Sequence, residues 1–331
     1  MKKLLISLLA IGITLGLVTA SWSINFGDIL NETLKPPPKK ETAPAPAPEQ
    51  AAPETSAPAE NSKGGGGLIG ILESTGAVDK KTSGILRGAG ALVQSLQPIG
   101  WEEERAIGGS LALEVFKNFG GQYKNDKLQR YVSLVGLSVA GVSDRADIPY
   151  HFAILNSNDP NAFATPGGYI FVSAGLLRLV RNEAELAGIL GHEVAHVAKR
   201  HALKTIERSK TLQGFSQLTT SILDSDPGVL DNIVKEMSAT LFTKGLDQNL
   251  EYEADKFGMD YAYRVGYNPG GLRDFMKVLG KAQGSHSVLL STHPTPRSRY
   301  GKLNAQAKRY GNVSLAPILS QRYSAETKGN L

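Results

Sequence analysis

The chain has no cysteine among its 331 residues. A thiol nucleophile, a thiolate metal site and disulfide bonds are therefore all excluded. The net charge of +5 is modest. No basic run is interleaved with aromatic residues, so nucleic-acid binding has no support in the sequence. No serine stands in a G-x-S-x-G setting, which leaves a serine hydrolase without support as well.

One long apolar run, at residues 4–18, stands near the start of the chain. It follows Lys2 and Lys3 and leads into the small-residue pattern V-T-A that ends at Ala20. This order predicts a secretory signal peptide over residues 1–20. Because the run is slightly shorter than the roughly 20 residues of a comfortable membrane span, an uncleaved anchor is the alternative.

The segment after the apolar run has too few apolar residues to form a core. Residues 36–62 are dominated by Pro, Ala and Glu, and residues 64–67 are all glycine. Such sequence behaves as an extended spacer. We therefore expect a disordered linker over residues 21–67 and a folded domain over residues 68–331.

The chemistry of the chain is indicated by residues 192–196, which read H-E-V-A-H. With 6 histidines in the whole chain, a chance match is improbable. In a helix that turns about 100° per residue, His192 and His196 lie within roughly 40° of each other. Two imidazoles held in this way can bind one Zn²⁺, and Glu193 can reach a water at the metal as general base.

The surrounding residues are typical of a helix at the edge of a core. Asn182 is a suitable N-cap, with acidic residues in the turn that follows. Apolar residues recur in a stripe beside the two histidines, which predicts a half-buried site. Gly191 leaves room for another segment to approach.

A catalytic zinc site needs a third protein ligand and an open fourth position. Residues 249–255 read N-L-E-Y-E-A-D. On a helix Glu251 and Asp255 share a face, whereas Glu253 points about 160° away from Glu251. We expect Glu251 to bind the metal and Asp255 to accept a proton from a ligating imidazole. His201, about 140° from the ligand face, is not expected to bind the metal.

Helical periodicity dominates the rest of the domain, with two short β-rich runs that should pair in a small sheet. The expected strands are residues 150–155 and 169–172. The expected helices are residues 101–119, 126–142, the zinc helix, two between 205 and 241, 249–265 and 272–283. The fold class is therefore α+β and mostly helical, with the zinc site between a helix pair and a sheet edge.

These motifs resemble those of the gluzincin metallopeptidases of the CAAX prenyl endopeptidase family, which combine H-E-x-x-H with a later E-x-x-x-D. Residues 161–168 (N-A-F-A-T-P-G-G) and the Y-I-F-V that follows are similar to the segment before the zinc helix in that family. His293-Pro294 with Arg299 is similar to its H-P-x-x-x-x-R segment. The branch of the family with a secreted catalytic domain is the most similar.

The resemblance implies a zincin-like metalloprotease domain with a small β-sheet beside the H-E-x-x-H helix. It implies one Zn²⁺ per chain, bound by His192, His196 and Glu251, with Glu193 as base. The expected function is a zinc metalloendopeptidase of the periplasm or its membrane surfaces. Its expected substrates are polypeptides, namely misfolded or stalled envelope and outer-membrane proteins.

Proteases of this type hold the substrate as an added β-strand. The strand made by Asn161, Ala162, Phe163 and Ala164 precedes the zinc helix and would suit that role. The alternative for this segment is a plain β-hairpin with a Pro-Gly turn.

His293 has two possible roles in such a site, because flanking prolines hold it on a stiff loop. It could reach the open zinc position and keep the enzyme latent. It could instead stabilise the oxyanion of the transition state together with Arg299. A histidine on a surface loop, with Arg299 solvated, is the third reading. The latent state is favoured, because an exported protease without a visible propeptide needs a restraint.

A different class of function is a zinc-stabilised periplasmic chaperone or binding module with little turnover. Glu193 argues against it, because a purely structural zinc site needs no base and usually has its fourth position closed.

Overall fold

A computed structural model describes residues 99–208, 227–281, 292–311 and 317–331. The expected signal peptide, the linker and the first part of the expected domain, up to residue 98, lie outside the described residues. Among the helices that are described, none combines the length and the apolar character needed to cross a membrane.

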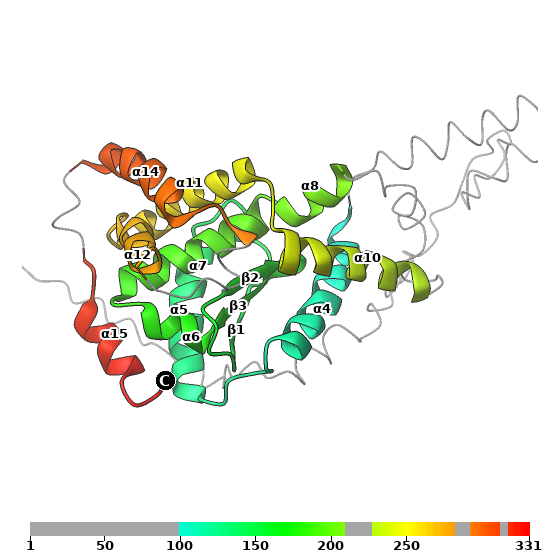
Figure 1. The fold of residues 1–331 in the computed structure, drawn as a ribbon, viewed down its shortest axis with the longest axis horizontal. Coiled ribbons are helices and arrows are strands. Elements are labelled where there is room, and N and C mark those ends of the chain that lie inside the picture. Colours follow the sequence, from blue (N-terminus) through cyan, green and yellow to red (C-terminus); the bar gives the residue numbers. More distant parts are fainter. Residues whose placement is uncertain (1–98, 209–226, 282–291, 312–316) are drawn as a thin grey trace, which may run out of the picture.

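The described residues form helices around one small sheet (Figure 1). In chain order the first described elements are α4 Trp101–Asn118, α5 Asp126–Ala140, β1 His151–Leu155, β2 Ala162–Thr165, η1 Pro166–Gly168, β3 Tyr169–Ser173, α6 Ala174–Leu179 and α7 Glu183–Ala198. They are followed by α8 His201–Arg208, α10 Pro227–Ala239, η2 Thr240–Lys244, α11 Gln248–Arg264, α12 Gly271–Leu279, α14 Pro296–Ala307, η3 Lys308–Tyr310 and α15 Ser320–Thr327. The mostly helical α+β fold class is confirmed.

The sheet has the strand order β1-β3-β2. β1 and β3, the two strands expected to pair, run parallel, and β2 runs antiparallel to β3. β2 and β3 are joined by the tight turn η1, so the Pro-Gly hairpin is present. Because β3 is central, β2 is an edge strand, and the helix pair that carries the site lies beside it (Figure 1).

Alternating side chains of the strands enter two different cores. Phe152 and Ile154 belong to the core that also contains buried residues of α5 and α7. Ala153 and Leu155 face the opposite way, into the core formed with α4. Since both faces of the sheet are covered, the strands read as nearly continuous apolar runs.

α7 is the central helix of the domain. It contacts α5, α11, α12 and the sheet, and every one of its residues is buried. Asn182 is its N-cap and accepts a hydrogen bond from the backbone N–H of Glu185. The prediction of a half-buried metal site is wrong for His192 and His196, which are 2 % and 7 % exposed, because packing on several sides of α7 covers the positions outside the apolar stripe as well.

Among the described α-helices, the sequence patterns did not predict α6, α14 and α15. α14 has few apolar residues, so its periodicity is weak. It begins with Pro296 in the first turn, and the Thr295 side chain accepts a hydrogen bond from Ser298 N. Its position after the His293 loop places Arg299 in the interior, where it is 3 % exposed.

α7 and α11 cross in backbone contact at two glycines. A Cβ on Gly191 would lie 2.6 Å from the carbonyl oxygen of Gly258, and a Cβ on Gly258 would lie 2.5 Å from the backbone nitrogen of His192. The expectation that Gly191 admits another segment is confirmed. This approach fixes α11 against the turn of α7 that carries the two motif histidines.

We predict that Gly258→Ala lowers the free energy of unfolding by about 1–3 kcal/mol, because the added methyl group meets backbone that cannot yield cheaply. Gly301→Ala in α14 is the matched control, since a Cβ there meets nothing within 4 Å. The control should be stabilised by about 0.5–1 kcal/mol. Chemical denaturation measures both changes, and a Gly258 variant as stable as the control would contradict the close crossing.

Candidate metal centre

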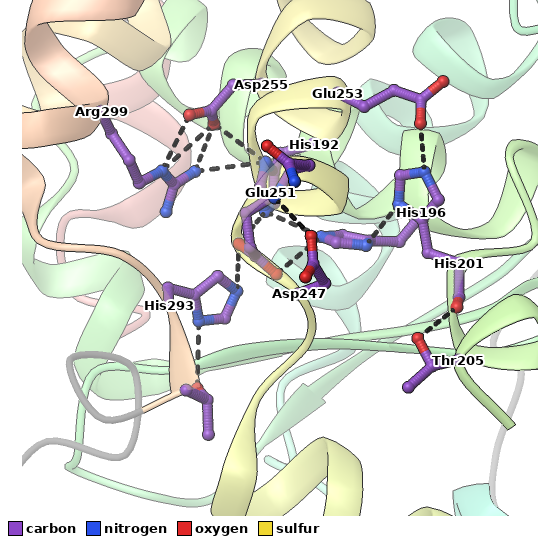
Figure 2. Close-up of polar contacts among 12 residues, drawn as sticks. His192, His196, His201, Thr205, Asp247, Glu251, Glu253, Asp255, His293 and Arg299 are labelled. Carbon is purple, nitrogen blue, oxygen red and sulfur yellow. Dashed lines mark hydrogen bonds and ion pairs between the residues drawn. The ribbon is translucent and has the colours of Figure 1, made fainter. Parts of the chain in front are cut away.

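Four side chains from three segments converge beside the crossing of α7 and α11 (Figure 2). His192 and His196 come from α7, Glu251 from α11, and His293 from the loop before α14. One ligand atom from each of the four lies within 4.8 Å of all the others. The sequence-predicted ligands His192, His196 and Glu251 are therefore brought together, and His293 joins them.

The individual distances describe a ring of electron-pair donors. His192 Nε2 and His196 Nε2 are 3.0 Å apart. Glu251 Oε2 lies 3.6 Å from His192 Nε2 and 3.6 Å from His293 Nε2, and Glu251 Oε1 lies 3.5 Å from His196 Nε2. Imidazole nitrogens and a carboxylate are the ligand types that Zn²⁺ prefers when thiolates are absent.

The chemistry of this donor set fits a cation. Glu251 is 1 % exposed, and its Oε2 is a buried atom without a hydrogen-bond partner. A buried carboxylate oxygen of this kind is costly unless it is paired or binds a metal. The two facing Nε2 atoms likewise need a positive group between them if both carry lone pairs.

The Nδ1 side of the His192 ring contacts Asp255, which forms an ion pair with Arg299. His192 Nδ1 lies 3.0 Å from Asp255 Oδ1, and Arg299 donates to both oxygens of Asp255. Arg299 Nη2 is also 3.2 Å from His192 Nδ1. Since Arg299 can only donate, it cannot share that nitrogen with Asp255. If His192 Nε2 presents its lone pair to a metal, the proton resides on Nδ1, and Asp255 is then its acceptor.

Burial controls the acid–base properties of the cluster. Burial lowers the pKa of His192 and of His196 well below the usual range, and it raises the pKa of Glu251 well above its usual range. Burial also raises the pKa of Glu193 to about 8. Neutral imidazole is the form that binds a metal ion, and a divalent cation would favour the ionised form of Glu251.

A cleft opens onto the cluster. Its walls include Glu193, His196, Glu251 and His293, together with Phe163 and Ala164 of β2. The rest of the lining comes from Ala162, Leu241, Gly245, Leu246 and Thr292. Glu193 therefore borders the same space as three members of the cluster.

Gly245 is the position where the chain before α11 passes the His293 loop. Its φ of 77° is positive, and a Cβ there would lie 2.1 Å from the carbonyl oxygen of Thr292. A side chain at this position would push the two segments apart. The Thr292 hydroxyl lies 3.0 Å from His293 Nδ1, so the opposite nitrogen, Nε2, is the one directed at the cluster.

The four residues expected to hold substrate do not share one environment. Asn161 precedes β2, and its carbonyl oxygen accepts a hydrogen bond from Ser173 N. Phe163 is packed inside the core against Phe119 and Phe242. Ala162 and Ala164 alternate with Phe163 on the edge strand, and Ala164 is half-buried at the cleft.

His201 is a residue whose position the sequence did not reveal. It lies outside the four-residue cluster, as expected, yet its Nδ1 is 3.0 Å from His196 Nδ1. Its Nε2 is 3.3 Å from Glu253 Oε2. The five-residue separation from His196 gave no signal for this contact, because α7 ends at Ala198 and its rotation per residue does not extend to His201 in α8.

Two packed helices beside a sheet edge supply the candidate metal ligands, and the glutamate of the H-E-x-x-H motif lines the cleft. This arrangement is typical of a metallopeptidase. Comparison with protein families agrees with this class, since residues 124–307 match peptidase family M48 over more than half of the chain. The chain belongs to peptidase family M48, and the expectation of a metallopeptidase family is confirmed.

Several curated relatives are similar to more than half of this chain. The β-barrel assembly-enhancing protease of Escherichia coli K12 is 29% identical over 193 residues, covering 55% of this chain and 39% of the relative. The mitochondrial metalloendopeptidase OMA1 of Schizosaccharomyces pombe is 27% identical over 213 residues, covering 60% and 62%. OMA1 of Arabidopsis thaliana is 32% identical over 169 residues, covering 51% and 33%. The chain thus spans well under half the length of the E. coli and A. thaliana relatives and about three fifths of the S. pombe relative.

We predict that the purified protein binds about one Zn²⁺ per chain and that Glu251→Ala abolishes this stoichiometric binding. Asp260→Ala, which removes a carboxylate paired with Arg264 on the same helix, is the matched control and should still bind one Zn²⁺. Elemental analysis after dialysis against a fixed free-zinc concentration measures both. Full occupancy in Glu251→Ala, with loss in Glu253→Ala, would move the ligand role to Glu253.

Proposed function

We propose that the protein is a zinc metalloendopeptidase in which His192, His196 and Glu251 bind the metal and Glu193 is the general base. The observation that carries the proposal is the convergence of these donors on one buried point, with Glu193 in the adjoining cleft. Membership of peptidase family M48 supports the same activity.

The reaction is hydrolysis of a peptide bond. When bound, Zn²⁺ supplies Lewis acidity toward the attacking water and the scissile carbonyl. Burial alone raises the pKa of Glu193 to about 8, and a bound divalent cation would favour its ionised form. In that form Glu193 accepts a proton from the water as the water oxygen bonds to the carbonyl carbon. The same carboxylic acid then donates the proton to the leaving nitrogen as the carbon–nitrogen bond breaks. Burial of Glu193, which is 3 % exposed, keeps this proton from bulk water.

The substrate would lie as an added strand along β2. Successive residues of an edge strand direct their backbone groups alternately toward the neighbouring strand and toward the open edge. The carbonyl oxygen of Asn161 accepts a hydrogen bond from Ser173 N, so the backbone of Asn161 faces the neighbouring strand β3. Alternation then directs the backbone groups of Ala162 and Ala164 toward the open edge. Because Ala162 N is bonded to the Asn161 side chain, Ala164 is the residue best placed to bind substrate backbone. This mode depends little on substrate sequence.

His293 is proposed to hold the enzyme in a latent state. Its Nε2 lies 3.6 Å from Glu251 Oε2, within the same cluster as the other ligand atoms. A fourth protein ligand would close the position that water needs. Departure of the His293 loop from the cluster would then open the cleft. A role in stabilising the oxyanion is the competing hypothesis.

Arg299 is better explained as a positioning residue than as a direct partner of the oxyanion. It is 3 % exposed and forms an ion pair with Asp255. The pair lies on the Nδ1 side of His192, away from the Nε2 that faces the cluster. Arg299 would keep Asp255 ionised and oriented, so that Asp255 can accept the His192 proton.

The proposed site of action is the periplasm or its membrane surfaces, with envelope proteins as substrates. Residues 1–20 have the pattern of an export signal, and residues 21–67 would act as a spacer. The name of the E. coli relative, β-barrel assembly-enhancing protease, fits outer-membrane proteins as the substrate class. A chaperone with little turnover is not favoured, because Glu193 is retained beside the cluster.

We predict that Glu193→Gln retains its fold and its zinc but hydrolyses casein about 10²–10⁴-fold more slowly, because an amide cannot accept the proton from water. Glu114→Gln on α4 is a control for loss of one carboxylate remote from the cleft. Cleavage by Glu193→Gln at the rate of the unmodified protein would refute the assigned base.

For the latent state, we predict that His293→Ala hydrolyses unfolded substrate faster than the unmodified protein, because the fourth position is no longer filled. The initial rate on casein at several substrate concentrations measures this. A fall of about 10²-fold would assign His293 to transition-state stabilisation instead. An unchanged rate at all concentrations would eliminate both roles.

A further inference from the structure

A second chain of polar contacts leads away from the zinc-binding histidines, on the side opposite to Asp255. His196 Nδ1 lies 3.0 Å from His201 Nδ1, and His201 Nε2 lies 3.3 Å from Glu253 Oε2. Figure 2 shows the three side chains in sequence, from the cluster to Glu253 on α11. The side chain of His201 is 0 % exposed, whereas that of Glu253 is 37 % exposed.

The direction of each hydrogen bond follows from the two ends of this chain of contacts. At one end His196 must offer a lone pair to the metal, and at the other the Glu253 carboxylate accepts hydrogen bonds. His196 Nε2 faces the cluster and must present a lone pair to bind a metal, so its proton resides on Nδ1. The N–H at His196 Nδ1 therefore donates a hydrogen bond to the lone pair of His201 Nδ1. A neutral His201 that accepts at Nδ1 carries its own proton on Nε2, which donates to the Glu253 carboxylate. One consistent set of tautomers thus runs from the metal ligand to the surface.

We propose that His201 and Glu253 are positioning residues that orient His196 for zinc. They do for His196 what Asp255 and Arg299 do for His192. A ligating imidazole whose other nitrogen donates a hydrogen bond is fixed in ring orientation and is the stronger base toward the metal. In this arrangement α11 supports the centre three times, through Glu251 directly, through Asp255 behind His192 and through Glu253 behind His196.

The turn between α7 and α8 is built to bring His201 back against His196. Arg200 adopts a left-handed conformation with φ 56°, which is uncommon for a residue other than glycine and costs on the order of 1 kcal/mol. Its backbone N–H donates to Val197 O. Its side chain donates to Ile99 O at 2.6 Å and lies 3.3 Å from Glu104 Oε2. These anchors hold the strained turn in place.

The inference rests on the proposed zinc site, and the experiment separates the two. Zinc affinity is measured by competition with a chromophoric chelator at fixed pH for the full chain and its variants. His201→Phe keeps ring volume but cannot accept the His196 proton, and should weaken binding by about 10- to 100-fold. His201→Gln can accept through its amide oxygen and donate to Glu253, so it should recover most of the affinity.

Two controls match these variants. His151→Phe replaces a histidine that stacks on Tyr169 in the sheet, and should leave the affinity unchanged. Asp260→Ala removes a carboxylate that pairs with Arg264 on the same helix as Glu253, and serves as the control for Glu253→Ala. Thermal unfolding of the metal-free proteins reports any purely structural damage, which would lower Tm without a selective effect on zinc.

The outcomes are distinct. Weak binding by His201→Phe with recovery in His201→Gln supports the proposal. Affinity in His201→Phe equal to that of the unmodified protein, or equal weakening by Phe and Gln, overturns it while leaving the zinc site intact. If the Phe variant does not fold, Glu253→Ala against Asp260→Ala decides, and equal affinities overturn the proposal. Absence of zinc binding by the unmodified protein would instead overturn the proposed function.

Discussion

The close crossing of α7 and α11 is the constraint on which the rest of the site depends. Gly191 and Gly258 let the two backbones touch next to His192. At that distance a short carboxylate side chain on α11 can reach the same point as two imidazoles on α7. A wider crossing, with ordinary side chains between the helices, would move Glu251 away from the histidines. Helix packing at this one point therefore comes before any metal chemistry.

The interior around the crossing is unusually polar, and its polar groups are arranged in pairs. Asp255 is buried with Arg299 as its partner, and the pair contacts His192 from behind. His196 is contacted from behind by His201, which leads to the half-exposed Glu253. Glu251 keeps one buried oxygen without a hydrogen-bond partner. The buried charges behind the histidines are thus paired. The carboxylate of Glu251, at the centre of the cluster, is the group that a cation would still stabilise.

Much of the site could be predicted from local periodicity. H-E-x-x-H on a helix places His192 and His196 on one face whatever surrounds them, and the spacing of Glu251 and Asp255 does the same on α11. The two paired strands and the long helices followed from their apolar patterns. α14 did not, because its helix is fixed by a cap and by tertiary contacts rather than by an apolar stripe. The burial of α7 was underestimated, since amphipathic patterning cannot count how many neighbours a helix will have.

The sequence by itself determined the donor types, the helical faces that carry them and the absence of thiol chemistry. These properties follow from residue identity and from the fixed rotation per residue of a helix. Only the tertiary structure decided that His293 lies with the other ligand atoms, that Arg299 is paired behind His192, and that His201 supports His196. Those contacts join segments separated by turns and loops, whose directions are set by packing and by single strained positions such as Arg200. No spacing rule along the chain encodes them.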